Sequence, residues 1–286
     1  MRWSERQRAM LREMGIPPFW PVEIEPVAPV AEPDPQPVSA HSALPEHIQA
    51  TVVSAPEPRV APPTSTRAAP SIATKPVAAG SADDKARVPR PDGVDLMDWP
   101  ALREAVGGCQ ACALCDSRQQ TVFGVGNIEA DWMIVGEAPG EEEDRRGEPF
   151  VGKAGQLLDR MLDALDLTRA EAPAAKQIYI ANVLKCRPPA NRNPLPEEVA
   201  QCEPYLLRQM ALVRPKVVVA MGRFAAQSLL KSSEAIGRLR GRVHHVDGIP
   251  VVVTYHPAYL LRNPADKGLV WDDLCLAREV RQQAGG

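Results

Sequence analysis

Polar side chains that can do chemistry follow three apolar segments of the sequence. Glu137 comes directly after the first segment, Asn182 lies near the end of the second, and His256 follows the last. A carboxylate, an amide and an imidazole that meet in one place can orient water, recognise a polar ring and stabilise a developing negative charge. Each is commonplace alone, so the case depends on whether the fold brings the three together.

The cysteines offer a second kind of site. Cys109 and Cys112 form a C-x2-C pair, and 15 residues separate Cys186 from Cys202. Four thiolates are enough to hold a zinc ion or an iron-sulfur cluster, and the spacing does not decide between them, although the second pair departs from the C-x2-C pattern of a zinc ribbon. The alternative is a set of buried thiols, and the other two cysteines are interpreted in that way.

Two nucleotide-binding motifs are nearly present, and both fail. The segment 147–154 resembles a P-loop, but Ala154 has no hydroxyl for Mg²⁺ and no apolar strand runs into Gly147. Gly136 and Gly140 are spaced G-x-x-x-G, which is not the dinucleotide fingerprint. An ATPase or a dehydrogenase is therefore disfavoured.

The elements that would position these residues alternate along the chain. Short apolar segments typical of strands covered on both faces lie at 132–136, 178–183, 217–221 and 251–254. Helical spacing occurs between them at 154–165, 196–213 and 223–230, and before them at 96–106. The sequence therefore predicts a three-layer, doubly wound α/β domain with a mostly parallel, four-stranded central sheet. Ligands of such folds bind beyond the carboxyl ends of the strands.

The first third of the chain has a different composition. Of the 30 prolines, 17 lie between Pro17 and Pro91, in a stretch without helical or strand periodicity. We expect a short amphipathic segment at 1–20, a disordered linker rich in Pro and Ala at 21–93, and one folded domain at 94–286. No run approaches the roughly 20 apolar residues of a membrane helix, and the charged start lacks the core of a secretory signal. A cytoplasmic protein is expected.

Charge is distributed unevenly along the chain, whose formal net charge is −3. Residues 92–175 contain 7 Lys and Arg against 17 Asp and Glu, whereas residues 176–262 contain 13 against 5. The second block therefore has a net charge of +8. If the Lys and Arg residues of this block lie together in the fold, they could form a basic surface that binds phosphate.

Several long motifs together resemble one protein family. The motifs are Cys109-x2-Cys112-x-Leu114-Cys115, Phe123-Gly-Val-Gly-Asn127, Gly136-Glu-Ala-Pro-Gly-Glu-Glu-Glu-Asp144, Gly147-Glu-Pro-Phe-Val-Gly-Lys-Ala-Gly155, Asn182-Val-Leu-Lys-Cys-Arg-Pro-Pro189 and His256-Pro-Ala-Tyr-Leu-Leu-Arg-Asn-Pro264. With these motifs in the family's order, residues 94–286, about two-thirds of the chain, resemble the type 4, iron-sulfur uracil-DNA glycosylases throughout. The resemblance implies hydrolysis of the N-glycosidic bond of uracil in DNA, the first step of base excision repair of deaminated cytosine.

The resemblance also implies a cofactor, because it favours iron-sulfur over zinc. One 4Fe-4S cluster would be bound by Cys109, Cys112, Cys186 and Cys202. The expected role of the cluster is to support the structure and to position DNA, since its ligands would tie the segment before the first strand to the loop 187–193.

A glycosylase must flip its target nucleotide into a pocket that recognises the base. By resemblance, Phe150 is the ring on which uracil stacks, and Asn182 reads uracil, because its amide matches the edge of uracil and mispairs with cytosine. Glu143 would line the pocket and exclude the 5-methyl group of thymine.

Bond cleavage needs stabilisation of the departing base. His256 suits a donor to the uracil oxygen, and the backbone amides at Glu137 and Ala138 could assist. The Glu137 carboxylate could orient water or offset positive charge on the sugar.

The segment 254–264 resembles the family's intercalation loop. Leu260 or Tyr259 would insert into the duplex, and Arg262 would grip phosphate. The loop 190–194 contains no histidine of the kind that traps abasic DNA in one branch of the superfamily, so turnover is expected.

Two other functions are compatible with parts of the sequence. One is a catalytically silent iron-sulfur module that binds DNA or docks to a repair complex, and the other is a redox protein. The full set of uracil-reading residues favours the enzyme. We expect a monomer with no membrane partner, whose N-terminal arm offers a site for a protein partner.

Overall fold

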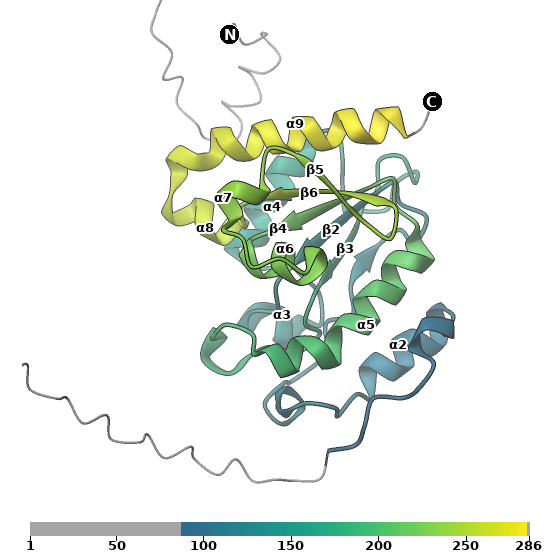
Figure 1. Ribbon diagram of the computed structural model, residues 1–286. Helices are drawn as coiled ribbons and strands as arrows, with labels where there is room; N and C mark the ends of the chain where they lie inside the picture. The colour runs from purple at the N-terminus through teal and green to yellow at the C-terminus, as the bar shows by residue number, and fades with distance from the viewer. Residues whose placement is uncertain (1–86, 285–286) are drawn as a thin grey trace, which may run out of the picture. The chain divides into compact units, whose positions relative to one another are not determined.

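The computed structural model describes residues 87–284 (Figure 1). Its core is a six-stranded sheet with the order β1-β3-β2-β4-β6-β5. The strands are β1 (Val125–Gly126), β2 (Trp132–Gly136), β3 (Tyr179–Asn182), β4 (Val217–Met221), β5 (Val243–Val246) and β6 (Ile249–Thr254). The four central strands are parallel, and the edge strands β1 and β5 are antiparallel to their neighbours. The predicted mostly parallel α/β sheet is confirmed, but the predicted number of four strands is wrong because both edge strands were missed.

Helices connect the strands and cover the sheet. They are α2 (Trp99–Gly107), α3 (Glu141–Arg146), α4 (Lys153–Asp163), α5 (Pro196–Val213), α6 (Arg223–Leu230), α7 (Ile236–Leu239), α8 (Pro257–Arg262) and α9 (Lys267–Gln283), with short 3-10 turns at Val94–Leu96, Ala113–Asp116, Pro189–Asn191 and Pro264–Asp266. The bounds predicted for α5 and α6 are confirmed to the residue. No helix within residues 87–284 is long and apolar enough to cross a membrane.

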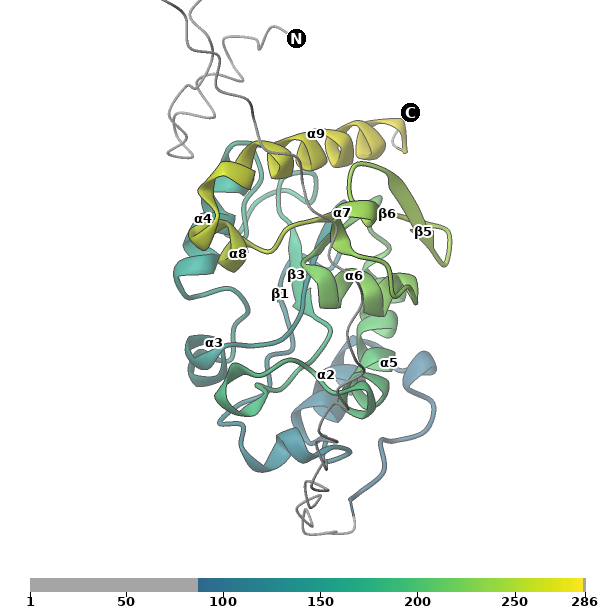
Figure 2. The same cartoon turned by 60° about the vertical axis from the view of Figure 1, so that its left-hand side comes forward.

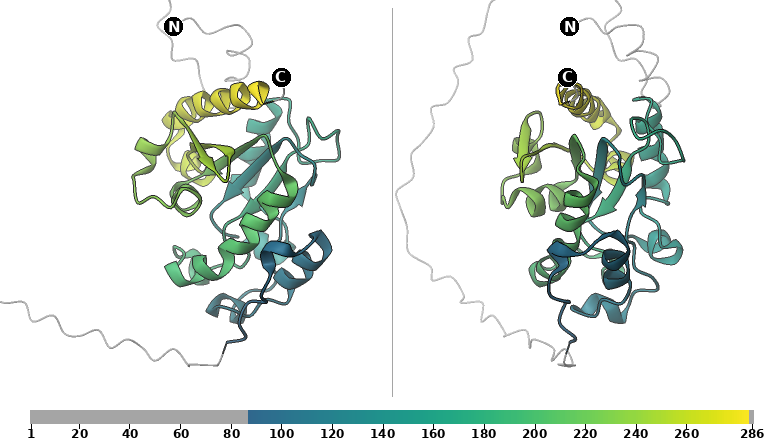
Figure 3. Two further views of the ribbon diagram at one scale, coloured as in Figure 1. Left: turned by 45° about the vertical axis from the view of Figure 1, so that its right-hand side comes forward. Right: turned by 90° about the vertical axis from the view of Figure 1, so that its right-hand side faces the viewer.

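Alternating residues of the strands face two helical layers. Val218 and Ala220 of β4 belong to an apolar core that also contains residues of α5 and α6, such as Leu206 and Leu229. The residues between them point to the other face, where α9 contacts β4 and β6. Helices are visible on both sides of the sheet in Figures 2 and 3. Burial on both faces explains why the central strands are such uniformly apolar runs.

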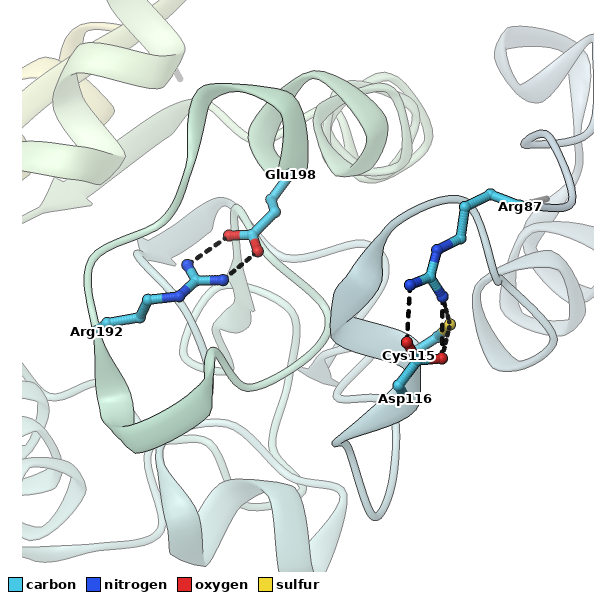
Figure 4. Close-up of polar contacts among 5 residues, drawn as sticks. All are labelled: Arg87, Cys115, Asp116, Arg192 and Glu198. Carbon is cyan, nitrogen blue, oxygen red and sulfur yellow. Dashed lines mark hydrogen bonds and ion pairs between the residues drawn. The ribbon is translucent and has the colours of Figure 1, made fainter. Parts of the chain in front are cut away.

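Contacts with the folded domain begin at the first described residues. The Arg87 guanidinium forms a bidentate ion pair with Asp116, with distances of 2.9 and 2.7 Å (Figure 4). Arg90 Nη1 donates a hydrogen bond to the carbonyl oxygen of Gln201 at 3.0 Å. The predictions for residues 1–20 and for most of the linker at 21–93 concern the part of the chain outside the described residues.

Candidate active site

The predicted polar residues lie at the carboxyl edge of the parallel strands. Glu137 follows β2, Asn182 ends β3, and His256 comes shortly after β6. Strand β3 lies on one side of β2 and β4 lies on the other, so the winding of the chain reverses beside β2. In a doubly wound sheet such a reversal opens a crevice for ligands.

Phe150, Asn182 and His256 converge on one recess at this edge. A Cβ atom built on Gly136 would lie 2.3 Å from Asn182 Oδ1 and 2.7 Å from Phe150 Cζ, so the amide and the phenyl ring border the same small space. The Phe150 ring is stacked with the His256 imidazole, with 5.3 Å between ring centroids and 26° between planes. Asn182 is 2% exposed, and its amide forms no hydrogen bond with a described residue. The recess thus joins a ring, a free amide and an imidazole.

The loop that carries Phe150 is held in a strained conformation. Phe150 has a φ of 56°, in the left-handed region that side chains other than glycine seldom adopt. Glu143 Oε1 accepts hydrogen bonds from the backbone N–H groups of Val151 at 2.9 Å and Gly152 at 3.1 Å. Glu143 Oε2 accepts a third from Gly140 at 3.1 Å. Glu143 therefore braces the loop after β2 against the loop that carries Phe150.

His256 is fixed in one tautomer by its own helix. The backbone N–H of Ala258 donates to His256 Nδ1 at 3.1 Å, which caps α8. An Nδ1 that accepts leaves the proton on Nε2. Burial lowers the pKa of His256 to about 4, although the nearby Glu143 carboxylate opposes the shift. The imidazole is therefore neutral at pH 7 and offers an Nε2–H donor.

Glu137 is half-buried at the edge of the sheet, and its carboxyl group forms no hydrogen bond with a described residue. Burial raises its pKa to about 7, and the positive charge of Arg223 limits the rise. A carboxyl group with this pKa changes its charge in the neutral range, as a general base requires.

An open cavity of about 430 Å³ adjoins the recess. Five of the predicted residues line it, and they are Glu137, Ala138, His256, Tyr259 and Arg262. Phe150 and Asn182 are buried beside it. The structure therefore assembles most of the predicted site around one opening.

The predicted DNA-contacting residues of helix α8 differ in their exposure to solvent. Arg262 is exposed, whereas the Tyr259 hydroxyl donates to Asp266 Oδ2 at 2.6 Å and its ring stacks on Tyr255 at 4.8 Å. Leu260 is only 1% exposed. The prediction that Leu260 inserts into DNA is therefore not supported by its position, because the helix turns this residue inward. Its neighbour Leu261 is 48% exposed.

The loop 188–195, which forms one wall of the cavity, is fastened by an ion pair that the sequence analysis missed. Arg192 Nη1 donates to Glu198 Oε2 at 2.9 Å, and the second guanidinium nitrogen contacts the other carboxylate oxygen (Figure 4). Glu198 is 2% exposed and also accepts the backbone N–H of Leu195 at 2.9 Å. The available signal was a glutamate at the third position of α5, where it can reach back to cap the helix.

The four predicted cysteine ligands surround one small pocket. Cys109 and Cys112 follow α2, Cys186 follows β3, and Cys202 lies in α5, yet all line the same space. Within residues 87–284, no three or more of His, Cys, Asp and Glu meet closely enough to share one metal ion. The thiolates of an iron-sulfur cluster bind different iron atoms, so they need not meet at one point.

The chemistry of the residues around the pocket fits metal ions bound by thiolates. Burial raises the pKa of Cys186 to about 11 and that of Cys202 to about 12, and binding of a metal ion would favour their thiolate forms. The buried Tyr205 hydroxyl, which also lines the pocket, has no hydrogen-bond partner among the described residues. The donor set and this orphaned hydroxyl both fit a thiolate-bound cluster.

The other two cysteines lie apart from this pocket. Cys115 accepts a hydrogen bond from Arg87 at 3.4 Å (Figure 4), and Cys275 lies in α9. Neither lines the pocket of the other four.

Comparison with known proteins identifies relatives of this chain. The model of the uracil DNA glycosylase superfamily matches residues 123–275. A type-4 uracil-DNA glycosylase of Archaeoglobus fulgidus is 46% identical over 164 residues, which cover 54% of this chain and 79% of that protein. The type-4 uracil-DNA glycosylases of Pyrobaculum aerophilum and Thermotoga maritima are each 40% identical, over 63% and 67% of this chain and 93% and 97% of theirs.

Proposed function

This chain belongs to the uracil-DNA glycosylase superfamily as a type-4 member, and we propose that it excises uracil in the recess formed by Phe150, Asn182 and His256. It hydrolyses the N-glycosidic bond of uracil in DNA and leaves an abasic site for base excision repair. The observation that carries the proposed site is the convergence of these three side chains at the edge of the sheet.

The activity is tested with oligonucleotides that contain a single uracil. After incubation with the purified protein, alkali cleaves the strand wherever a base has been removed. We expect scission at the uracil and none when thymine or cytosine replaces it. An intact uracil strand at micromolar protein would contradict the assignment.

Recognition of uracil is assigned to Asn182 and Phe150. The Asn182 amide presents one donor and one acceptor to a base that lies against the Phe150 ring. Cytosine has the opposite arrangement of donor and acceptor on its edge, so it would leave the buried amide unpaired. The bracing of the Phe150 loop by Glu143 supports this geometry, since it fixes the ring before DNA binds.

Stabilisation of the leaving base is assigned to His256. When the bond between sugar and base breaks, negative charge develops on uracil, and the Nε2–H of a neutral imidazole can donate to a uracil oxygen. The hydrogen bond from Ala258 to Nδ1 keeps this proton on Nε2.

Orientation of the attacking water is assigned to Glu137. The carboxylate form is the active one, so the rate of excision should rise with pH through about 7 and level off above it. Glu137→Gln should be slower and should lose this dependence. Single-turnover rates between pH 5 and pH 9 measure both effects, with the exposed Glu129→Gln as a control. An unchanged pH profile in Glu137→Gln would exclude Glu137 as the titrating group.

A 4Fe-4S cluster is assigned to Cys109, Cys112, Cys186 and Cys202. The cluster, when bound, supplies a cross-link between the segment before β2 and the segment after β3, and the bond cleavage itself is left to the residues of the recess. The support is their placement around one pocket, in a chain 46% identical to a type-4 enzyme.

Cys186→Ala should lose the visible absorption of the cluster and its iron. Its melting temperature should fall by roughly 10 °C, because metal binding contributes to the free energy of folding. Absorption spectra, iron analysis and thermal unfolding measure these effects. Cys275→Ala, which alters a cysteine of α9 away from the pocket, should keep the chromophore. A Cys186→Ala protein with the iron content of the wild type would overturn the ligand assignment.

Contact with DNA is assigned to the exposed face of α8. Arg262 is placed to pair with a phosphate, and Leu261 replaces Leu260 as the side chain that enters the duplex, because it is exposed where Leu260 is buried.

A further inference from the structure

Lys185 is a buried cation for which the described residues provide no carboxylate partner. It is 1% exposed, and its Nζ donates to the carbonyl oxygen of Asn182 at 2.7 Å and to Gln209 Oε1 at 2.6 Å. Both acceptors are neutral. A buried ammonium without a negative counterpart is costly. Negative charge bound beside Lys185 would therefore stabilise its ammonium form.

The nearest candidate for that charge is the pocket of the four cysteines, which Lys185 also lines. The backbone N–H of Lys185 donates to Cys202 Sγ at 3.1 Å, so this residue is in direct contact with one of the assigned ligands.

Arg118 is a second cation at the same pocket. Its Nη1 donates to Cys186 Sγ at 3.2 Å and to the carbonyl oxygen of Cys109 at 2.7 Å. Its Nη2 donates to the carbonyl oxygen of Gly107 at 3.3 Å. Among the described residues, no carboxylate pairs with this guanidinium either.

We propose that Lys185 and Arg118 are the two counter-cations of the cluster, and that Lys185 also positions Asn182. This inference rests on the proposed function of the four cysteines. Four thiolates around a doubly positive 4Fe-4S core leave two negative charges, and two cations balance them. Groups that lie around metal ligands in this way stabilise the bound metal.

Only one of the two cations reaches the uracil recess. Lys185 Nζ donates a hydrogen bond to the main-chain carbonyl oxygen of Asn182. Its other partner, Gln209, is fixed in turn because its Nε2 donates to the Tyr179 hydroxyl at 3.0 Å and to the carbonyl oxygen of Phe123 at 2.9 Å. Arg118 makes no contact of this kind. The two cations should therefore have the same effect on the cluster and different effects on uracil excision.

The test compares Lys185→Met, Arg118→Met and Arg187→Met in the holoenzyme. The decay of the visible absorption is followed after addition of a chelator and ferricyanide. Lys185→Met and Arg118→Met should each lose the cluster roughly tenfold faster than the wild type. Arg187→Met is the matched control, because it removes a positive charge directly after Cys186 while its guanidinium contacts Asn191 and Glu141. It should decay at the wild-type rate.

Uracil excision by the variants that still contain the cluster tests the second role of Lys185, which is to position Asn182. The kcat/KM for a uracil oligonucleotide should fall in Lys185→Met and stay near the wild-type value in Arg118→Met.

If Lys185→Met does not fold, the decay rate of Arg118→Met still decides the counter-cation role, and Gln209→Met tests the support of Asn182 from the other partner. Decay at the wild-type rate in a coloured Arg118→Met protein would overturn the counter-cation role. Equal kcat/KM values for cluster-containing Lys185→Met and Arg118→Met would overturn the positioning role of Lys185. A wild type without iron would instead refute the cluster itself.

Discussion

Asn182→Ala should reduce the rate of uracil excision by roughly a thousandfold, because it removes the group that pairs with the edge of the base. The amide is buried at the end of β3 and is not engaged by any described residue, so it is available to the substrate. Single-turnover excision from a uracil oligonucleotide measures the effect.

The matched control for this variant is Asn127→Ala. Asn127 follows β1 and hydrogen-bonds near the start of β3, so it lies toward the opposite end of that strand. The Asn127→Ala protein should excise uracil at the wild-type rate. A folded Asn182→Ala protein with more than about a tenth of the wild-type rate would show that uracil is read elsewhere.

His256→Ala should slow excision by roughly a hundredfold to a thousandfold, the range found when one donor to a developing negative charge is removed. The histidine acts as a neutral donor with a pKa of about 4. In Glu137→Gln, where the group with a pKa of about 7 is absent, the residual rate should therefore stay constant from pH 9 down to about pH 5.

The control for the histidine variant is His245→Ala, which alters an exposed imidazole of β5. Binding of DNA should be unchanged in both variants, since the role of His256 concerns the leaving group. If His256→Ala lost affinity for DNA but kept the wild-type rate at saturation, His256 would be a binding residue and its assignment to the leaving group would be wrong.

The central strands and the main helices were predictable from the sequence because both faces of the sheet are buried. Continuous apolar runs gave β2 and β4 their bounds, and helical spacing did the same for α5 and α6. The edge strands were missed for the opposite reason. β1 has two residues, and β5 reads Val243-His-His-Val246, with one exposed residue and none that is fully buried, so neither produces an apolar run.

Helix α3 shows where local sequence patterns mislead. The run Glu141 to Asp144 lacks the apolar spacing that indicates a helix, yet it begins α3, in which two carboxylates accept hydrogen bonds from other segments. Asp144 is 1% exposed and accepts the backbone N–H groups of Gln119 and Gln120, while Glu143 braces the Phe150 loop. These partners are distant in sequence, so spacing alone could not reveal them.

The candidate site was largely predictable, since the carboxyl ends of parallel strands must meet at one edge. The burial of Leu260, one of the two residues expected to enter DNA, was not predictable, because a single step along a helix turns a side chain from solvent to core. The role of Lys185 was also not predictable, because it is inferred from the absence of a carboxylate around Lys185 among the described residues.

The most direct test of the proposed recess is the structure of the protein bound to DNA with a 2′-fluoro-deoxyuridine, whose glycosidic bond resists cleavage. We expect the flipped uracil to lie against the Phe150 ring, with the Asn182 amide and His256 Nε2 within hydrogen-bond distance of its edge, at roughly 3 Å. A uracil bound outside this recess, or one that leaves the Asn182 amide unpaired, would contradict the account.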